Sequence, residues 1–424
     1  MKIPTANDVL AFLFLASAVL GYIVSYGKFY LFHAIAILYI SAIAIGLVKI
    51  KTKSFKTTSI LILFIFFATA SLLWAPDVVN GLYTIFYLLC GYLIVFFIVN
   101  YAADAKKLKF VFLVLASFIS LNIFIGLLET LSVYRLPMSP FYETKLTRPT
   151  GFNFNPNDFG FVFISILSFL FFYPSKIIKF IALILSLWFI LKLESKGFFA
   201  AILFFYFLLL IHEMRRVKFE TMFGVLAILI LAPTLVIILV KSHVVLDNRA
   251  FSLLIEINRG LELMSSPEIL VEDSTSHRAY MYSYGLEQLF ESNGFGLGAL
   301  GIGSLLAKGG DTAHAFHSFH NFFLEMLIDF GILPFVIMMT GYFYLSLRLI
   351  KISKFIQDDR LSYFANASGF SLLAMLPASI SPSSIIYMFI FYLIIGFAIA
   401  TLNICNKHCY SIFSSNIIGH SRPA

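Results

Sequence analysis

Long apolar runs recur along the chain, and they constrain its fold more than any other feature. A transmembrane helix needs about 20 mostly apolar residues, within a range of about 17 to 25. Runs near this length occupy residues 9–26, 29–48, 59–74, 82–99, 108–132, 159–173, 177–191, 197–211, 219–240, 332–350, 363–380 and 384–402. They predict an all-α polytopic membrane protein with about 12 transmembrane helices.

The composition is that of a membrane protein. The 424 residues are 60% hydrophobic and 12% charged, whereas soluble domains are about 45–50% apolar and about 25% charged. So few charges cannot cover the surface of a water-soluble protein of this length. The composition therefore excludes a cytosolic enzyme, a disordered chain and a nucleic-acid-binding protein, although the net charge is +8.

The positions of the basic residues predict the orientation of the chain. If the N-terminus is cytoplasmic and the spans alternate, 19 of the 30 Lys and Arg residues fall on the inside. Short cytoplasmic loops of membrane proteins are enriched in Lys and Arg, and long loops follow this rule weakly. Five of the remaining cations lie in one long loop. We therefore expect a multi-pass membrane protein with both termini in the cytoplasm.

Two connections on the predicted external side are long. Residues 133–158 contain four of the 13 prolines, and residues 241–331 contain five of the nine histidines. Loops of this length are uncommon unless they are functional or disordered. The chain is thus expected to hold spans one to nine in 1–240, a large external loop with amphipathic helices in 241–331, and spans ten to twelve with a cytoplasmic tail in 332–424. Chemistry is expected on the external face.

The first group of candidate residues is the segment Arg148-Pro-Thr-Gly-Phe-Asn-Phe-Asn-Pro-Asn-Asp158. Arg148 carries a planar guanidinium group, which binds phosphate through paired hydrogen bonds. Asn157 or Asp158 is placed to cap the helix that follows. The segment is therefore either a phosphate-binding loop, with Arg148 and Asn157 as ligands, or a turn followed by a helix cap.

The second group is the predicted external turn Glu194-Ser-Lys-Gly197. A Lys at a membrane surface is usually a solvated anchor. Lys196, however, stands beside Gly197 at the start of a helix, where the helix dipole and free N–H groups already favour an anion. Lys196 is therefore a candidate for contact with phosphate.

The large loop contains a basic pair and a glycine run. His277-Arg278 opens an amphipathic stretch that continues through residues 279–290, and residues 293–303 contain five glycines. No Lys-Ser or Lys-Thr pair follows the glycines, so the pattern does not favour nucleotide binding. We interpret the run as a flexible loop that exposes its backbone.

Three histidines follow in His314-Ala-Phe-His317-Ser-Phe-His320-Asn321. Their spacing would place them on one helical face, so a zinc site is an alternative, although the H-E-x-x-H pattern is absent. The favoured interpretation is that His320 acts as a base at the membrane surface. Asn321 or Ser318 is expected to cap an amphipathic helix over residues 322–330 that ends at Gly331.

Together these motifs resemble those of a known superfamily. The matching residues, in chain order, are Arg148, Gly151, Asn155, Asn157, Ser195-Lys196-Gly197, Arg278 ahead of the glycine run, and His320-Asn321 followed by Leu324 and Gly331. In this order they resemble the O-antigen polymerase and O-antigen ligase superfamily, membrane glycosyltransferases related to the GT-C class. The resemblance covers about residues 140 to 340. Many relatives carry Ser-Arg-Gly where this chain has Ser195-Lys196-Gly197, and a Lys keeps the charge but loses the bidentate geometry.

The resemblance implies a GT-C-like fold and a donor glycan on undecaprenyl diphosphate. It also implies a place in the bacterial inner (cytoplasmic) membrane, with the active face and the large loop 241–331 periplasmic. It assigns Arg278 and His320 as catalytic residues, and Arg148, Lys196, Asn157 and Asn321 as residues that bind the substrate or its diphosphate. The cations would neutralise the leaving group without a metal or another cofactor. An imidazole, with an ordinary pKa near 6.5, would deprotonate the acceptor hydroxyl.

Within the superfamily two activities remain open. A polymerase joins lipid-linked oligosaccharide repeat units, and a ligase transfers the finished glycan to lipid A–core. The Phe-, Ile-, Lys- and Asn-rich composition favours the polymerase. Its expected partners are the lipid-linked donor and acceptor, membrane lipid and a chain-length regulator. A flippase for lipid-linked oligosaccharides is a third alternative, disfavoured because no charged residue lies at the middle of a predicted span.

Overall fold

The computed structural model describes residues 5–26, 29–137, 139, 142, 148–214, 274–308, 319–382 and 384–419. The ninth predicted span and the first part of the large loop lie outside this set. The helices are α1 (Ala6–Leu20), α2 (Leu31–Ala44), α3 (Thr52–Thr57), α4 (Ser59–Ala70), α5 (Val78–Tyr101), α6 (Ala105–Thr130), α7 (Pro156–Phe172), α8 (Lys176–Leu193), α9 (Lys196–Met214), α12 (Ser274–Glu291), α13 (Gly301–Lys308), α14 (Phe322–Phe330), α15 (Ile332–Ile352), α16 (Asp359–Ala378) and α17 (Phe389–Gly419). Short 3₁₀ helices cover Gly21–Ile23, Ser71–Leu73 and Ile385–Tyr387, and the strands β1 (Ser25–Tyr26) and β2 (Phe29–Tyr30) form a small antiparallel hairpin.

The fold is that of an all-α membrane protein. A helix occurs at each predicted span that falls within the described residues. Four of the described helices are long and apolar enough to cross a bilayer, namely Val78–Tyr101, Ala105–Thr130, Ile332–Ile352 and Phe389–Cys409. Other apolar helices are shorter than a full span, so the expected number of about 12 spans stays a prediction.

The helix α1 shows why some helices are shorter than their apolar runs. It begins after Thr5 in a capping box: the Thr5 hydroxyl accepts a hydrogen bond from the Asp8 N–H, and the Asp8 carboxylate accepts one from the Thr5 N–H. It ends at Leu20 because Gly21 adopts a positive φ of 44°. The remaining residues of the predicted run form the 3₁₀ turn and strand β1.

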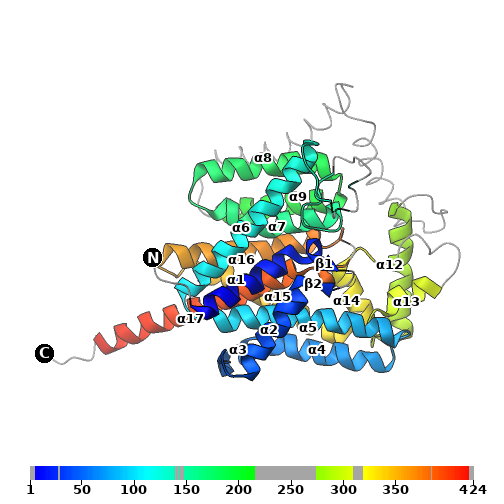
Figure 1. Ribbon diagram of the computed structural model, residues 1–424, viewed down its shortest axis with the longest axis horizontal. Helices are drawn as coiled ribbons and strands as arrows, with labels where there is room; N and C mark the ends of the chain where they lie inside the picture. Colours follow the sequence, from blue (N-terminus) through cyan, green and yellow to red (C-terminus); the bar gives the residue numbers. More distant parts are fainter. Residues whose placement is uncertain are drawn as a thin grey trace.

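The helices α16 and α17 lie at the centre of the bundle. The helix α16 packs against α7, α9, α15 and α17, while α17 also packs against α5, α6 and α1. Most of these helices run along the length of the molecule, whereas α12 lies across one end, beside α13 and α14 (Figure 1). The sequence of α16 and α17 explains their place, because both carry apolar side chains around most of their circumference and bury them.

Small residues let the central helices approach closely. The hydroxyl of Ser346 donates to the Gly369 carbonyl at 2.8 Å, and that of Ser168 donates to the Ala367 carbonyl at 2.7 Å. A Cβ on Gly369 would lie 2.9 Å from the Ser346 carbonyl oxygen. Small residues and interhelical hydrogen bonds of this kind are typical of helix packing in membranes.

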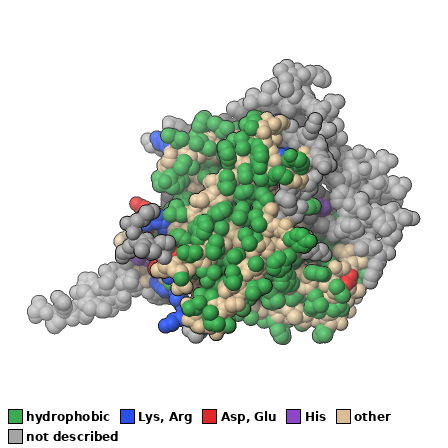
Figure 2. All heavy atoms as spheres, viewed as in Figure 1, with side chains coloured by type: hydrophobic (Ala, Val, Ile, Leu, Met, Phe, Trp, Pro, Cys, Tyr) green, Lys and Arg blue, Asp and Glu red, His purple; other side chains and the backbone are tan. Residues whose placement is uncertain are grey.

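The two ends of the bundle differ in character. At one end, the Lys51 ammonium donates to the Asn100 carbonyl at 2.9 Å, and the Lys407 ammonium donates to the Ala103 carbonyl at 3.2 Å. We call this end, defined by Lys51, Lys107 and Lys407, the cationic end. Hydrophobic side chains cover the middle of the molecule, and most visible Lys and Arg side chains lie along its left edge (Figure 2). The candidate residues lie at the opposite end, on the connections from α6 to α7 and from α8 to α9 and beside α14.

Candidate functional site

The segment before α7 is fixed to the end of α6 by a buried carboxylate. The Glu129 side chain is 2% exposed and accepts hydrogen bonds from the backbone N–H of Thr150 at 2.5 Å and of Gly151 at 2.8 Å. Asn122 accepts one from the Phe152 N–H at 2.6 Å. Gly151 has a positive φ of 54°, and a Cβ there would lie 2.0 Å from Asn122 Oδ1. Glycine is therefore required at this position.

The cap of α7 differs from the prediction. The Asn155 side chain accepts a hydrogen bond from the Asp158 N–H at 2.9 Å, so Asn155 is the N-cap and Pro156 is the first helical residue. The prediction that Asn157 or Asp158 caps this helix is wrong. A Pro is favoured directly after an N-cap because its missing N–H leaves no donor unpaired there, which places the cap one residue before Pro156. Asn157 itself lies in the first turn of α7, partly exposed.

Arg148 is held at this end by two other charged side chains. Its guanidinium forms an ion pair with Glu194, and its backbone carbonyl accepts a hydrogen bond from Arg135 at 2.6 Å. Glu194 ends α8 in the left-handed conformation, with φ 50°. The side chains of Arg148 and Glu194 are 39% and 35% exposed. The first predicted motif therefore contacts the second, the turn that contains Lys196.

The turn Ser195-Lys196-Gly197 is bonded on both sides of its lysine to one serine. The Ser195 hydroxyl donates to Ser381 Oγ at 3.2 Å, and the Gly197 N–H donates to the same oxygen at 3.1 Å. A Cβ on Gly197 would lie 2.2 Å from Ser381 Oγ, so only glycine allows this approach. Lys196 is the first residue of α9 and is partly exposed, as an anion ligand at a helix N-terminus must be.

The His320 side chain contacts the backbone of the same serine, Ser381. Its Nδ1 lies 3.2 Å from the Ser381 carbonyl oxygen. Because a carbonyl only accepts, Nδ1 must carry the proton, and in the neutral ring Nε2 is then the basic nitrogen. His320 also adopts a positive φ of 49°. Such a conformation is uncommon outside glycine and persists where the surroundings enforce it, often at functional sites.

The neighbours of His320 enforce that conformation. Phe319 is 1% exposed and stacks on Tyr282 of α12, with ring centroids 5.7 Å apart. The Asn321 side chain accepts a hydrogen bond from the Leu324 N–H at 3.2 Å and caps α14, and the helix ends at Gly331. The predicted helix over residues 322–330 is thus confirmed, with Asn321 as its cap. The Phe322 N–H donates to the Ser379 carbonyl at 3.3 Å.

Arg278 lies within α12, one turn before Tyr282 in the helix, and its side chain falls outside the described residues. His314, His317 and Ser318 also lie outside them, so the zinc alternative stays a hypothesis. In the part of the chain that the structure describes, no group of three or more His, Cys, Asp or Glu side chains is placed to hold a metal ion.

The interpretation of the glycine run as a flexible, exposed loop is wrong. The Leu297 and Gly298 N–H groups donate to the carbonyls of Ile328 and Asp329, at 2.9 and 2.8 Å. A Cβ on Gly298 would lie 2.7 Å from the Ser71 carbonyl oxygen. The glycines serve close packing of this backbone between α14 and the segment that precedes α5, where Trp74 donates its indole N–H to the Gly296 carbonyl at 3.2 Å.

Two buried carboxyl groups of α14, Glu325 and Asp329, were not predicted from the sequence. Glu325 accepts a hydrogen bond from the Ser384 hydroxyl at 3.3 Å, and Asp329 accepts one from the Ile302 N–H at 3.0 Å at the start of α13. Among the described residues neither Glu325 Oε2 nor Asp329 Oδ2 has a hydrogen-bond partner. Burial raises the pKa of Asp329 to about 7. Burial also raises the pKa of Glu325 well above its ordinary value, and the nearby charge of Asp329 raises the Glu325 pKa further. A carboxylate without full hydrogen bonding is costly in such surroundings, so both groups favour the neutral form.

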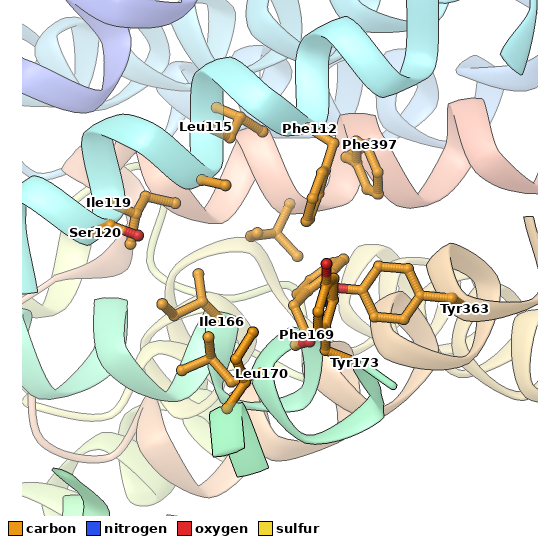
Figure 3. Close-up of a pocket in the computed structure, with 13 residues that line it drawn as sticks. Phe112, Leu115, Ile119, Ser120, Ile166, Phe169, Leu170, Tyr173, Tyr363 and Phe397 are labelled. Atoms are coloured by element: carbon orange, nitrogen blue, oxygen red, sulfur yellow. Dashed lines mark hydrogen bonds between the residues drawn. The ribbon is translucent and has the colours of Figure 1, made fainter. Parts of the chain in front are cut away.

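A cavity of about 190 Å³ lies between α6, α7, α16 and α17. Figure 3 shows Phe112, Phe169 and Phe397 on its walls with Tyr173 and Tyr363 at one side. Its lining includes no charged side chain. Its lining residues come from the middle of α6 and the second half of α7, whereas the candidate residues lie after the end of α6 and at the start of α7. This cavity is therefore not a phosphate site.

The structure brings three predicted site residues into one cluster. Consecutive contacts join Arg148 to Glu194, the turn around Lys196 to Ser381, and Ser381 to His320. We call these residues the external cluster. The sequence analysis missed Ser381 and Glu129. A serine within Ser-Pro-Ser-Ser has no distinctive pattern, and Glu129 could have been found as the one acid within the apolar run 108–132.

Comparison with known proteins identifies a relative. No family model matches the chain. The chain is similar to the teichuronic acid biosynthesis protein TuaE of Bacillus subtilis, with 26% identity over 392 residues, which span 85% of this chain and 76% of TuaE. The similarity supports the predicted resemblance to a superfamily of surface-polysaccharide assembly.

Proposed function

We propose that this protein is a membrane glycosyltransferase that joins undecaprenyl-diphosphate-linked oligosaccharide repeat units at the outer face of the cytoplasmic membrane. A role in surface-polysaccharide biosynthesis is supported by the similarity to TuaE. The observation that carries the finer proposal is the external cluster itself. It combines a guanidinium, an ammonium and an imidazole at one end of an apolar bundle, which suits a lipid diphosphate and a hydroxyl acceptor.

The chemistry follows from the residues of the cluster. His320 Nε2 takes the proton of the acceptor hydroxyl as its oxygen attacks the anomeric carbon of the donor. The bond between that carbon and the diphosphate oxygen breaks, and undecaprenyl diphosphate leaves with the bonding electrons. Arg148 and Lys196 neutralise the negative charge that grows on the leaving group. Arg278 serves the same purpose from α12. The step is a single inverting displacement.

Of the two activities within the superfamily, polymerisation is favoured. The relative is named for teichuronic acid and not for lipopolysaccharide. The flippase alternative gains no support from the cavity between α6 and α17, because its lining carries no charge to accompany a diphosphate across the bilayer.

The test uses purified protein in detergent with a single lipid-linked repeat unit as both donor and acceptor. We expect products of two or more repeats without a membrane gradient. A flippase cannot make them, and a ligase does not make them because it transfers glycan only to lipid A–core. Because general base catalysis contributes about 10²- to 10⁴-fold, His320→Ala should lower the rate by about that factor. Arg348→Ala, on α15 away from the cluster, is the matched control. Elongation by His320→Ala at the wild-type rate contradicts the assignment of the base.

A further inference from the structure

We propose that Ser381 is a positioning residue that couples the base His320 to the phosphate-binding turn around Lys196. This inference rests on the proposed function and adds a residue from the segment after α16, which neither the motifs nor the relative assigns. Ser381 is 4% exposed, so it acts through its neighbours and does not contact substrate.

One residue makes both connections through different atoms. The side-chain oxygen of Ser381 accepts hydrogen bonds from Ser195 and from the Gly197 N–H, one on each side of Lys196. Its carbonyl oxygen accepts the proton of His320 Nδ1. A displacement of Ser381 therefore moves the imidazole and the lysine turn relative to each other.

The reaction makes this relative position important. In a displacement at the anomeric carbon, the attacking hydroxyl and the departing diphosphate lie on opposite sides of the reacting atom. The base and the cation that serve them must be held at a fixed separation. Because near-attack geometry is narrow, a shift of about 1 Å costs about 10²-fold in rate. The two contacts of the Ser381 hydroxyl are buried, and the contact of its carbonyl with His320 is partly buried, so all three exclude most of the solvent.

The packing of Gly197 against Ser381 supplies an independent way to disturb the link. A Cβ at position 197 would lie 2.2 Å from Ser381 Oγ and 3.0 Å from Ser381 Cβ. Gly197→Ala must therefore push Ser381 away. In a Ser381→Gly background both of these atoms are gone, and the nearest atom of residue 381 is its backbone nitrogen at 3.3 Å. The damage from Gly197→Ala should then largely disappear.

The first experiment separates binding from turnover. We expect Ser381→Ala to lower kcat by about 10- to 100-fold while KM for the lipid-linked donor stays within about twofold. The matched control is Ser168→Ala, which also removes a buried hydroxyl bonded to another helix, but in the middle of the bundle. It should keep the wild-type kcat. A purely structural role of Ser381 would lower the amount of folded protein and leave kcat per folded molecule unchanged, which overturns the proposal.

The second experiment is a double-mutant cycle of Gly197→Ala and Ser381→Gly, with folded protein measured by gel filtration and thermal unfolding. Coupled sites give a double variant no slower than Ser381→Gly alone. Additive losses overturn the coupling. Absence of elongation by the wild-type protein contradicts the proposed function itself. A slow His320→Ala together with full kcat in Ser381→Ala contradicts only the positioning role.

Discussion

At the scale of single residues, the ion pair between Arg148 and Glu194 competes with substrate. An exposed pair of this kind contributes about 0.2–1 kcal/mol, so a diphosphate can replace the Glu194 carboxylate at low cost. Glu194→Gln leaves the Arg148 guanidinium without that competitor. We therefore expect KM for the lipid-linked donor to fall by about 1.4- to 5-fold, which is that energy expressed as a ratio. Initial rates at varied donor concentration measure it.

Removal of one negative charge from the external surface also changes the field that the donor meets. The control is Glu287→Gln, an exposed acid of α12 outside the external cluster. Equal effects of the two substitutions, or a higher KM in Glu194→Gln, would show that the pair does not compete with the diphosphate and that Glu194 instead helps to hold Arg148.

Glu129 determines whether the Arg148 segment stays docked on α6. Glu129→Ala leaves the N–H groups of Thr150 and Gly151 buried without an acceptor. A buried donor left unsatisfied costs about 1–3 kcal/mol. We expect a lower temperature of unfolding in detergent together with a higher KM for the donor. Glu287→Ala on the surface of α12 should change neither quantity, and an unchanged unfolding temperature in Glu129→Ala would argue against the docking role.

Single residues also show where inference from the sequence ends. Arg148, Lys196 and His320 were predicted because cations and imidazole beside Gly and Asn form local patterns. Ser381 was not, because its partners Ser195 and Gly197 lie more than 180 residues away, as the separation of their hydrogen bonds shows. The role of the Ser381 hydroxyl depends on the fold, and the residues beside it in the sequence do not indicate that role.

At the scale of helices, Asp329 joins two elements of the external end. It belongs to α14 and accepts the Ile302 N–H at the start of α13. Its pKa is about 7 in the folded protein against an ordinary value of 3.8. Between these values the folded state holds a proton that the unfolded chain has released, so this group makes stability fall as pH rises through this range, with no further change above it.

Asp329→Asn removes this titration because an amide is neutral at every pH. We expect the unfolding temperature of the variant, relative to wild type, to rise by a few degrees between about pH 5 and about pH 8. Scanning fluorimetry in detergent measures the difference, and Glu325 is present in both proteins. Asp359→Asn, at the exposed start of α16, should show a pH-independent difference. The same flat response in Asp329→Asn would contradict the raised pKa.

The helices themselves were more predictable than their ends. Apolar runs identified a helix at each predicted span that the structure describes, since the length of an apolar run can be counted in the sequence. The end of α1 at Leu20 depends on the positive φ of Gly21, which an apolar run does not reveal. The glycine run was misinterpreted for a related reason. Gly298 permits a flexible loop and close packing equally, and only the approach of the Ser71 carbonyl decides between them.

At the scale of the whole molecule, the lysines of the cationic end and the residues of the external cluster lie at opposite ends of the bundle. Lys51 and Lys407 bond backbone carbonyls at the cationic end, whereas Arg148, Lys196 and His320 gather at the other. The positive-inside rule predicts that the cationic end faces the cytoplasm. The external cluster would then face the leaflet where a lipid-linked glycan is displayed after transport, so the proposed function depends on this orientation.

Cysteine accessibility tests the orientation directly. The natural Cys90, Cys405 and Cys409 are first replaced by Ala, and single cysteines are then introduced as Glu287→Cys on α12 or Lys354→Cys after α15, both exposed positions. In spheroplasts, a membrane-impermeant maleimide should label Glu287→Cys, and it should label Lys354→Cys only after lysis. Each variant must still elongate lipid-linked glycan, which shows that the labelled molecules are folded. The reverse pattern would turn the external cluster toward the cytoplasm, where polymerisation at the outer leaflet cannot occur.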